Sequence, residues 1–482
     1  MASLQNIDGL ETGMLIGGKI VAGSQTFKVI NPSTGAPFAT APHASAKEVD
    51  AAVSAASAAF KTWSRTPASD RIACLERCSE ILSANSKSIA ALLVKEQGKP
   101  LKFALGEIAA CLADLKHAMD IAEPDTDVYS ETETHRVEVK RRPIGVCAGI
   151  SPWNFPLICS LPKWATAVAL GNTFVLKPSP YTPLTALALG VLLKDVFPPG
   201  VLNVVSGSDA PEYGFNVGAY LTKHPQVKKV SFTGSVRTGK AIYASAANDV
   251  KRITLEMGGN DAAIVRPDVD VKKVAPAIAG GAFFNTGQVC VAIKRCFVHE
   301  SIYDAFVEEI VKAASEARVG DGMDPTTQYG PLNNKMQFDR CKELFDDAVA
   351  NGAKVHCGGE ALPGDGYYFK PTILTGVKEG VRIVDEEQFS PILPVMAYKT
   401  EDEALERANS TALGLGGSVW GSDKAKTNAL ADRMECGTVW VNEHMSPTGA
   451  PFGGFKESGL GREGGKSDVA AFTEVQTRKV LK

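Results

Sequence analysis

Three side chains in different parts of the chain could act together in covalent chemistry. Cys290 follows the polar turn "FNTGQV" and lies between two valines, so its thiol is a candidate nucleophile. Glu256, in "TLEMGGND", follows a short apolar run and precedes two glycines. Asn154, in "SPWNFP", is held between prolines and aromatics, a stiff frame that fixes the direction of its amide. A thiol taken alone is more often a small buried apolar group, so the case for Cys290 depends on these neighbours.

A second group of residues predicts a nucleotide crevice. In "VSFTGSVRTGK" an apolar strand runs into Thr233, Gly234 and Ser235, and a helix then begins. Backbone amides at a helix N-terminus, together with a hydroxyl, favour a phosphate oxyanion. Lys177, in "VLKPSP", comes at the end of another predicted strand, where doubly wound folds bind ligands. Each alone is compatible with a plain turn or a solvated lysine, but together they favour a nucleotide.

One glycine motif is a decoy. Gly459, Gly461 and Gly464, in "SGLGREGG", match the pattern G-x-G-x-x-G of dinucleotide-binding folds. That pattern has mechanical meaning only between a strand and a helix inside a βαβ unit. Too little chain remains after Gly464 to complete such a unit, so we expect a glycine-rich turn.

These residues must be positioned by an α/β fold. We expect the first 120 residues to be mainly helical, with Ser45 and Glu48 forming a capping box at the start of a helix. From Gly145 short apolar strands alternate with helical runs, which is typical of a parallel sheet with helices on both faces. A second such series follows Cys290. The alternating segment His135–Arg142 and the C-terminal "FTEVQTRKVLK" predict a projecting β extension that pairs with another chain.

The composition of the chain excludes several classes. With 482 residues, a net charge of −3 and a pI near 6.2, it is not expected to bind nucleic acid or an anionic membrane. The N-terminus lacks the pattern of a secretory signal and no run is long enough to span a bilayer, so we expect a soluble, cytoplasmic protein. The ten cysteines and seven histidines are scattered, which predicts neither a disulfide framework nor a metal site.

Together with "EEQFSP" and "PFGGFKESGLGRE", the motifs around these residues resemble the aldehyde dehydrogenase superfamily over nearly the whole chain. The resemblance implies an NAD(P)-dependent, hydrolytic, non-CoA-acylating enzyme. Its thiolate, Cys290, attacks an aldehyde to give a thiohemiacetal and then a thioester. Asn154 and the backbone N–H of Cys290 would stabilise the oxyanion, Glu256 would activate water, and Lys163 would support this network.

The resemblance also implies the cofactor and substrate contacts. It gives a Rossmann-type cofactor domain, an α/β catalytic domain and a β-ribbon oligomerisation extension, and a homodimer or homotetramer. We expect the cofactor domain over residues 1–124 and 144–255, the catalytic domain over 256–445, and the extension over 125–143 and 466–482. The residues expected to contact NAD or NADP are Trp153, Lys177, Gly214, Gly218, Phe232, Gly234, Ser235, Glu387 and Phe389. The aldehyde pocket is expected to contain Leu157, Phe284, Val289, Val291 and Phe452.

Departures from the family pattern bear on specificity. Many NAD-selective relatives have a glutamate at the position of Pro180, where it would repel the 2′-phosphate of NADP; we therefore predict use of both cofactors. Relatives that oxidise succinate semialdehyde often carry arginines at the positions of Pro162 and Phe284. An aliphatic or aromatic aldehyde is thus the expected substrate, and Ser390 in place of a common glycine carries little weight.

Other functions remain as alternatives. Within the family these are a succinate-semialdehyde-type dehydrogenase and a coenzyme A-acylating enzyme, although the latter generally lacks the glutamate found here at Glu256. An amide or nitrile hydrolase built on Cys290, Glu256 and a lysine would leave the nucleotide crevice without a role. A catalytically silent scaffold of the same fold would not need to keep Cys290, Glu256 and Asn154.

Overall fold

The computed structural model describes residues 5–124, 126–446 and 449–482; residues 1–4 of the expected cofactor domain and residue 125 of the expected extension lie outside them. An eight-stranded sheet has the order β23-β13-β12-β9-β10-β11-β3-β4. Its five central strands are parallel, as the alternation from Gly145 predicts. The strands are β3 (Met14–Ile16), β4 (Lys19–Val21), β9 (Val146–Ile150), β10 (Thr173–Lys177), β11 (Leu202–Val204), β12 (Val227–Thr233), β13 (Arg252–Glu256) and β23 (Gly459–Leu460).

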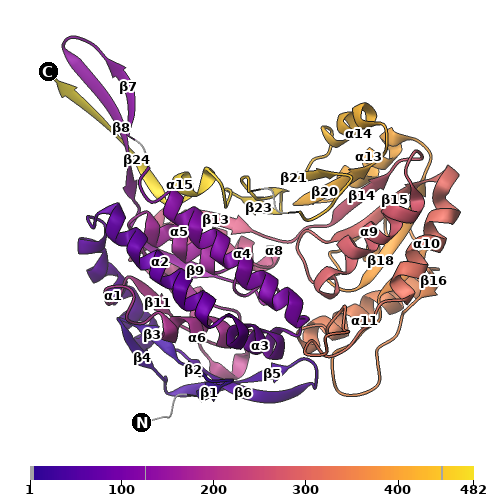
Figure 1. Ribbon diagram of the computed structural model, residues 1–482, viewed down its shortest axis with the longest axis horizontal. Coiled ribbons are helices and arrows are strands. Elements are labelled where there is room, and N and C mark those ends of the chain that lie inside the picture. The colour runs from indigo at the N-terminus through magenta and orange to yellow at the C-terminus, as the bar shows by residue number, and fades with distance from the viewer. Residues whose placement is uncertain (1–4, 125, 447–448) are drawn as a thin grey trace.

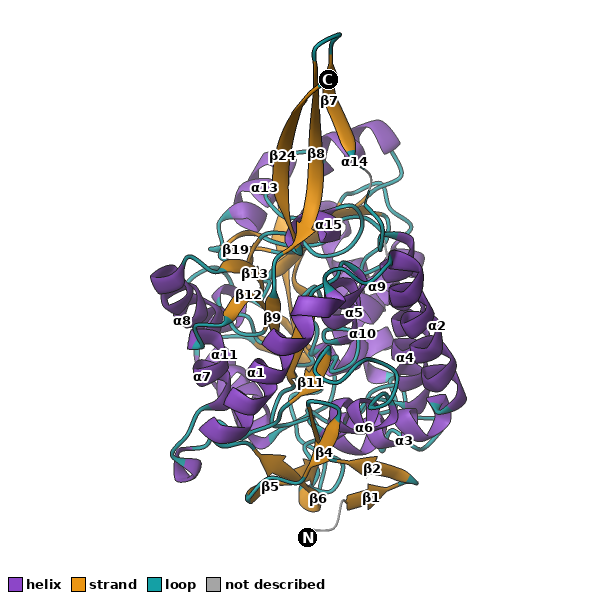
Figure 2. Ribbon diagram, turned by 90° about the vertical axis from the view of Figure 1, so that its left-hand side faces the viewer, coloured by secondary structure: helices purple, strands orange, loops and turns teal. Residues whose placement is uncertain are grey.

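Helices cover both faces of this first sheet. Figure 2 shows α7 and α8 on one side of β9 and β12, with α2 and α4 on the other. The predicted capping box of Ser45 and Glu48 begins α1, and α3 ends at Gly98, whose φ of 97° is left-handed. The helices are α1 (Ala46–Trp63), α2 (Ala68–Ala84), α3 (Ser86–Gln97), α4 (Leu101–Asp120), α5 (Leu161–Ala169), α6 (Leu184–Leu192), α7 (Val217–Lys223) and α8 (Val236–Ala246).

The expectation of a mainly helical N-terminal region is wrong for residues 5–43. This part forms strands: β3 and β4 join the first sheet, while β1 (Gln5–Ile7) pairs with β2 (Leu10–Thr12) and β5 (Gln25–Asn31) with β6 (Ala36–His43). The alternation along β5, where exposed and buried residues follow one another, is short and favours a strand over a helix. The helical prediction holds from residue 46 onwards.

A seven-stranded second sheet has the order β16-β17-β18-β15-β14-β20-β21, and all its strands except β16 run parallel to their neighbours. The strands are β14 (Asp261–Val265), β15 (Ile293–His299), β16 (Lys354–Cys357), β17 (Thr372–Thr375), β18 (Ile392–Tyr398), β20 (Gly416–Trp420) and β21 (Thr438–Val441). The helices around it are α9 (Val271–Phe283), α10 (Tyr303–Ser315), α11 (Lys335–Ala350), α12 (Arg382–Asp385), α13 (Glu401–Asn409) and α14 (Lys424–Ala431). No helix in the described residues is long and apolar enough to cross a bilayer.

A third sheet forms an arm that projects from the body, upper left in Figure 1. Its central strand, β8 (His135–Pro143), pairs along its whole length with β24 (Thr473–Leu481) and also with β7 (Asp127–Glu131). Both predicted ribbon strands are thereby confirmed. Large apolar side chains stay exposed on the arm, with Tyr129 at 81% and Leu481 at 73%.

The ends of the strands of the two large sheets face the same cavity. Lys177 and Glu256 end β10 and β13 at the carboxyl edge of the first sheet. Cys290 and Glu387 lie in loops that lead into β15 and β18, so they belong to the amino edge of the second sheet. The decoy glycines lie in β23 and the turn after it, where Gly461 and Gly464 have positive φ, and not in a βαβ unit. The crevice at the carboxyl edge is where open α/β sheets bind their ligands.

Candidate active site

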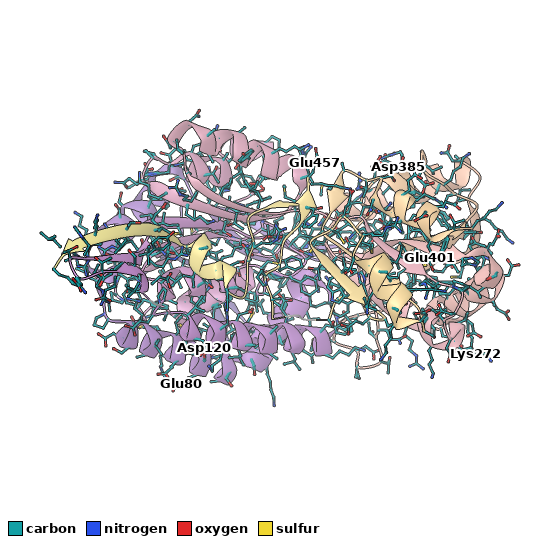
Figure 3. All side chains as sticks on the ribbon, turned by 90° about the horizontal axis from the view of Figure 1, so that it is seen from above. Glu80, Asp120, Lys272, Asp385, Glu401 and Glu457 are labelled. Atoms are coloured by element: carbon teal, nitrogen blue, oxygen red, sulfur yellow. The ribbon has the colours of Figure 1, made fainter. Side chains whose placement is uncertain are left out.

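A cavity of about 1790 Å³ lies between the two edges. The first sheet contributes the end of β12, the start of α8 and Glu256, while the second contributes the loops around Cys290 and Glu387. Glu457 and Asp385 are exposed and also line the cavity. Seen from above, they project from the same edge of the molecule (Figure 3). Asn154, Glu256 and Cys290, predicted from separate motifs, thus meet on one cavity.

A strained turn presents Cys290 to this cavity. Asn285, Thr286 and Gly287 have consecutive positive φ values of 49°, 60° and 74°. A Cβ at Gly287 would lie 2.2 Å from the carbonyl oxygen of Ser390, so only glycine fits there. Gln288 locks the turn, because its Nε2 donates to Asn285 O at 2.9 Å and its Oε1 accepts from Asn333 N at 2.8 Å. Two non-glycine residues in left-handed conformation indicate a turn held by its surroundings.

The environment of Cys290 keeps its thiol protonated. Burial raises its pKa to about 12; the Lys294 charge lowers it, and Glu387, Asp261 and Glu256 raise it further. The nucleophile is therefore neutral near pH 7 in the protein alone, and thiolate formation requires a change in this surrounding charge.

Asn154 lies directly against the nucleophile turn. Its Nδ2 donates to Gln288 O at 3.0 Å. The backbone carbonyl oxygen of Asn154 accepts from Asn285 Nδ2 at 3.1 Å and from Lys99 Nζ at 2.9 Å. Lys99 in turn forms a fully buried ion pair with Glu107, 2.6 Å apart. The amide is thus fixed beside Cys290 by contacts on both its side chain and its backbone.

Glu256 is a buried carboxyl group at the end of β13. Its side chain is cradled by Gly453, where a Cβ would lie 2.7 Å from Oε1. Neither carboxyl oxygen has a hydrogen-bond partner among the described residues. Burial raises its pKa well above the usual range, the nearby Glu463 raises it further, and Lys163 and Arg462 only partly offset this. Such a group can accept a proton at neutral to alkaline pH.

Lys163 belongs to the network beside Glu256 and does not line the cavity itself. Its Nζ donates to Glu463 Oε2 at 2.7 Å, and Ser231 Oγ donates to Glu463 Oε1 at 2.6 Å. Glu463 lines the cavity and lies in the glycine-rich turn of the decoy motif. The sequence interpretation missed it, although a charged residue among turn glycines was the available signal.

Three residues predicted for the nicotinamide end lie close together. The rings of Trp153 and Phe389 meet edge to face with centroids 5.3 Å apart. Glu387 Oε1 accepts from Gly259 N at 3.1 Å. A Cβ at Gly258 would lie only 2.0 Å from Glu387 Oε2, so the paired glycines make room for this carboxylate.

The phosphate end is formed by the start of α8. Ser235 caps this helix by accepting from Thr238 N at 3.3 Å, and residues 233–237 line the cavity. Phe232 does not line it; its ring packs beneath Gly234, where a Cβ would come within 2.6 Å of it. The Gly234 N–H donates to Glu256 O at 3.0 Å, and the missing side chain of Gly234 leaves room for the Phe232 ring at the start of α8.

The residues predicted for the adenosine end form a separate group outside the lining of the cavity. Lys177 is buried, with Nζ 3.8 Å from Asp209 Oδ1; burial lowers its pKa and Asp209 partly restores it. Gly218 lies against the Lys177 side chain: a Cβ added to Gly218 would lie 3.4 Å from Lys177 Cδ. Gly214 ends the short turn that precedes α7.

The aldehyde end of the cavity is mostly apolar. Phe284, Val289, Val291 and Phe452 line it as expected. Leu157 does not line it: its side chain is 1% exposed and packs in the core beneath the first sheet. Backbone bonds from Cys159 N to Phe155 O and from Leu161 N to Leu157 O make this segment a helical turn. Helical spacing turns one face to the cavity and Leu157 away from it; that face comprises Phe155, Ile158, Cys159 and Pro162.

Two further residues were missed. Asp114 on α4 lines the cavity; burial raises its pKa to about 6, and its Oδ2 lacks a partner among the described residues. Lys294 lies buried behind Cys290. Its signal was the cation pair Lys294–Arg295 inside an otherwise apolar strand, whereas Asp114 sits in an ordinary amphipathic helix and gave none.

Comparisons with known proteins agree over nearly the whole chain. A profile of the aldehyde dehydrogenase family matches residues 20–478. Human retinaldehyde dehydrogenase 3 is 40% identical over 94% of this chain and 89% of its own length. Mitochondrial aldehyde dehydrogenase of Leishmania tarentolae is 39% identical over 96% and 94%.

Solved structures give the same result. An NAD+ complex of aldehyde dehydrogenase from Bacillus cereus superimposes with a TM-score of 0.94 at 34% identity, covering 98% of this chain and 96% of that one. An NADP-dependent enzyme from E. coli superimposes with a TM-score of 0.95 at 34% identity, covering both chains in full. The chain belongs to the aldehyde dehydrogenase family, the NAD(P)-dependent enzymes that oxidise aldehydes.

Proposed function

We propose that the protein oxidises an aliphatic or aromatic aldehyde to the carboxylic acid through a thiohemiacetal and a thioester on Cys290. The observation that carries this proposal is the meeting of Cys290, Asn154 and Glu256 on one cavity that also includes the N-terminus of α8. These groups supply a nucleophile, an amide donor and a buried base.

The residues present fit a dinucleotide. The cradle at Gly234, the capped start of α8 and the space that Gly258 leaves beside Glu387 suit a pyrophosphate and a ribose. The dinucleotide would be held by Trp153, Lys177, Gly214, Gly218, Phe232, Gly234, Ser235, Glu387 and Phe389. A bound nicotinamide would supply the hydride acceptor for oxidation of the thiohemiacetal.

The chain's own residues perform the remaining steps. Cys290 Sγ bonds to the carbonyl carbon as its thiol proton passes to solvent, and the electron pair of the carbonyl π bond moves to oxygen. Asn154 Nδ2 and the Cys290 N–H donate to that oxyanion. After oxidation leaves a thioester, water attacks its carbon, Glu256 takes a water proton, and the Cys290 sulfur departs with the electron pair of the C–S bond. Lys163 acts on Glu256 through its ion pair with Glu463.

The charge of the pocket supports an uncharged substrate. Phe284, Val289, Val291 and Phe452 surround the thiol, and Pro162 lines the wall near them. Among the lining residues that the structure describes in 152–162, 284–291 and 445–464, none is a cation, and Asp114 adds a carboxyl group. A carboxylated aldehyde would be desolvated there without a partner.

The test is reduction of NAD and NADP with short, long-chain, aromatic and carboxylated aldehydes. We expect turnover of apolar aldehydes, loss of turnover in Cys290→Ser, and retention in Cys159→Ala, a second thiol that lines the same cavity. Turnover of succinate semialdehyde alone would overturn the apolar assignment. A folded protein that oxidises no aldehyde would point to a silent scaffold.

For the cofactor, we propose that both NAD and NADP are used, because Pro180 can neither bind the ribose hydroxyls nor repel a 2′-phosphate. The NAD+ complex and the NADP-dependent enzyme among the similar structures are consistent with either choice. A preference above a hundredfold for one cofactor would contradict the proposal.

We further propose domain boundaries at 1–124 with 144–255, at 256–445, and at 125–143 with 466–482, and a homodimer or homotetramer formed through the arm. We also propose that the protein is cytoplasmic; one relative is named as mitochondrial, so fractionation of cells is the direct test.

A further inference from the structure

Lys294, the second residue of β15, is a buried lysine directly behind the nucleophile. Its side chain is 2% exposed. Its Nζ donates to Cys290 O at 2.7 Å, to Val289 O at 2.9 Å and to Ala292 O at 3.4 Å. One cation thus binds three carbonyl groups of the loop that carries Cys290.

Two carboxyl groups, one buried and one partly exposed, offset the charge of Lys294. Glu387 Oε1 lies 3.6 Å from its Nζ. Asp261, at the start of β14, interacts with the same charge and accepts from Gly416 N at 3.1 Å. The Phe389 ring centroid lies 5.9 Å away. A buried ammonium without such partners would be costly, so this arrangement maintains a cation beside the thiol.

The bond to Val289 O also determines the direction of the Cys290 N–H. In a trans peptide the carbonyl oxygen of one residue and the N–H of the next point in opposite directions. Since Val289 O faces Lys294, the Cys290 N–H faces away from it. The bond to Cys290 O fixes the following peptide plane in the same way. Lys294 therefore orients the backbone donor that the proposed mechanism assigns to the oxyanion.

Lys294 also carries the favourable charge for a thiolate. The described groups that act most strongly on Cys290 are Lys294, Glu387, Asp261 and Glu256, and only Lys294 is a cation; Cys159 from the helical turn opposite also interacts with it. Without Lys294, a thiolate at Cys290 would lose the strongest favourable charge acting on it and would still face three carboxyl groups.

We propose that Lys294 is a positioning residue of the reaction, which holds the nucleophile loop by its carbonyls and favours the Cys290 thiolate by its charge. The inference rests on the proposed function for its catalytic meaning, but its test requires neither aldehyde nor cofactor.

The experiment measures the rate of Cys290 alkylation by iodoacetamide between pH 7 and pH 10, followed by mass spectrometry of the Cys290 peptide. In Lys294→Met we expect the profile to move to higher pH by about one unit or more, which makes alkylation roughly tenfold slower at a fixed pH below the midpoint. Lys294→Arg, which keeps the charge, is expected to restore most of the rate.

The matched control is Lys229→Met. Lys229 is an equally buried lysine on β12 whose Nζ donates to Thr254 Oγ1, and its loss is expected to leave the Cys290 profile unchanged. If Lys294→Met does not fold, Lys294→Gln gives the same readout. A folded neutral variant with the wild-type profile overturns the proposal. A shifted profile in a protein that oxidises no aldehyde supports the role of Lys294 and rejects only the proposed function.

Discussion

At the scale of single residues, burial disfavours the charged forms of both reactive groups in the free protein. Burial raises the pKa of both the Cys290 thiol and the Glu256 carboxyl, and each charge would raise the other's pKa further. Two adjacent anions in one apolar cavity are thereby avoided. Cys290 and Glu256 are then expected to ionise at separate stages of the reaction.

Replacement of Glu256 by glutamine is expected to stop the cycle at the thioester. The rate at saturating substrate should fall by about 10²–10⁴ because water loses its base, while one equivalent of reduced cofactor per site still forms in the first turnover. Stopped-flow absorbance separates this burst from the steady state. In the wild type, thioester hydrolysis should accelerate with rising pH as Glu256 loses its proton. Loss of the burst together with the steady state would argue against a role limited to hydrolysis.

The same substitution is expected to raise stability at alkaline pH. Burial raises the pKa of Glu256 in the folded state above its ordinary value, so the folded state binds more protons than the unfolded state and stability falls as pH rises between the two pKa values. Glu256→Gln removes this loss. Urea unfolding should show a higher free energy of unfolding for the variant at pH 8 and no difference at pH 4. Equal effects at both values would contradict the assignment.

Asp209 is expected to limit NADP use. Its carboxylate lies 3.8 Å from Lys177 and is half-exposed, so it can repel a 2′-phosphate where Pro180 cannot. Asp209→Asn should raise kcat/KM for NADP relative to NAD by about tenfold, because it removes one solvent-screened repulsion between the carboxylate and the 2′-phosphate. Asp195→Asn, at another exposed ion pair, serves as control and should leave the ratio unchanged.

At the scale of elements, the loop between α9 and β15 positions the Cys290 thiol. Its left-handed turn is maintained by the Gln288 bonds, by the close approach of the Ser390 carbonyl in the loop before β18, and by the Lys294 bonds. A nucleophile on such a loop depends on backbone geometry as much as on its own side chain.

Two glycine substitutions test this dependence. Gly287→Ala places a Cβ 2.2 Å from Ser390 O at a φ of 74° and should lower the free energy of unfolding by at least about 1–3 kcal/mol, with a larger loss of activity. Gly280→Ala in α9 meets no atom within 4 Å and should stabilise by about 0.4–1 kcal/mol. Similar effects of the two changes would show that the turn is not under strain.

At the scale of the whole molecule, the arm formed by β7, β8 and β24 projects from the body and leaves large apolar side chains exposed. Tyr129 and Leu481 are exposed on it, although β24 and β8 pair over nine residues. We expect the double variant Tyr129→Glu and Leu481→Glu to shift the protein to a smaller species in size-exclusion chromatography with light scattering. Val349→Glu on α11, also an exposed apolar residue, should leave the mass unchanged. An unaltered mass in the arm variant would count against assembly through this sheet.

The parallel α/β architecture and the ribbon could be predicted from the sequence, because apolar strands and turn glycines are local signals. The motifs also nominated Cys290, Glu256 and Asn154, which the structure brings to one cavity. The sequence did not reveal the N-terminal strands, whose pattern is short, or that Leu157 faces the core, since one helical turn decides this. The roles of Glu463, Asp114 and Lys294 became clear from the tertiary structure, although Glu463 and Lys294 had local signals in the sequence. Their chemistry depends on burial and on partners far away in the chain, and these exist only once the strand ends of the two sheets face the same cavity.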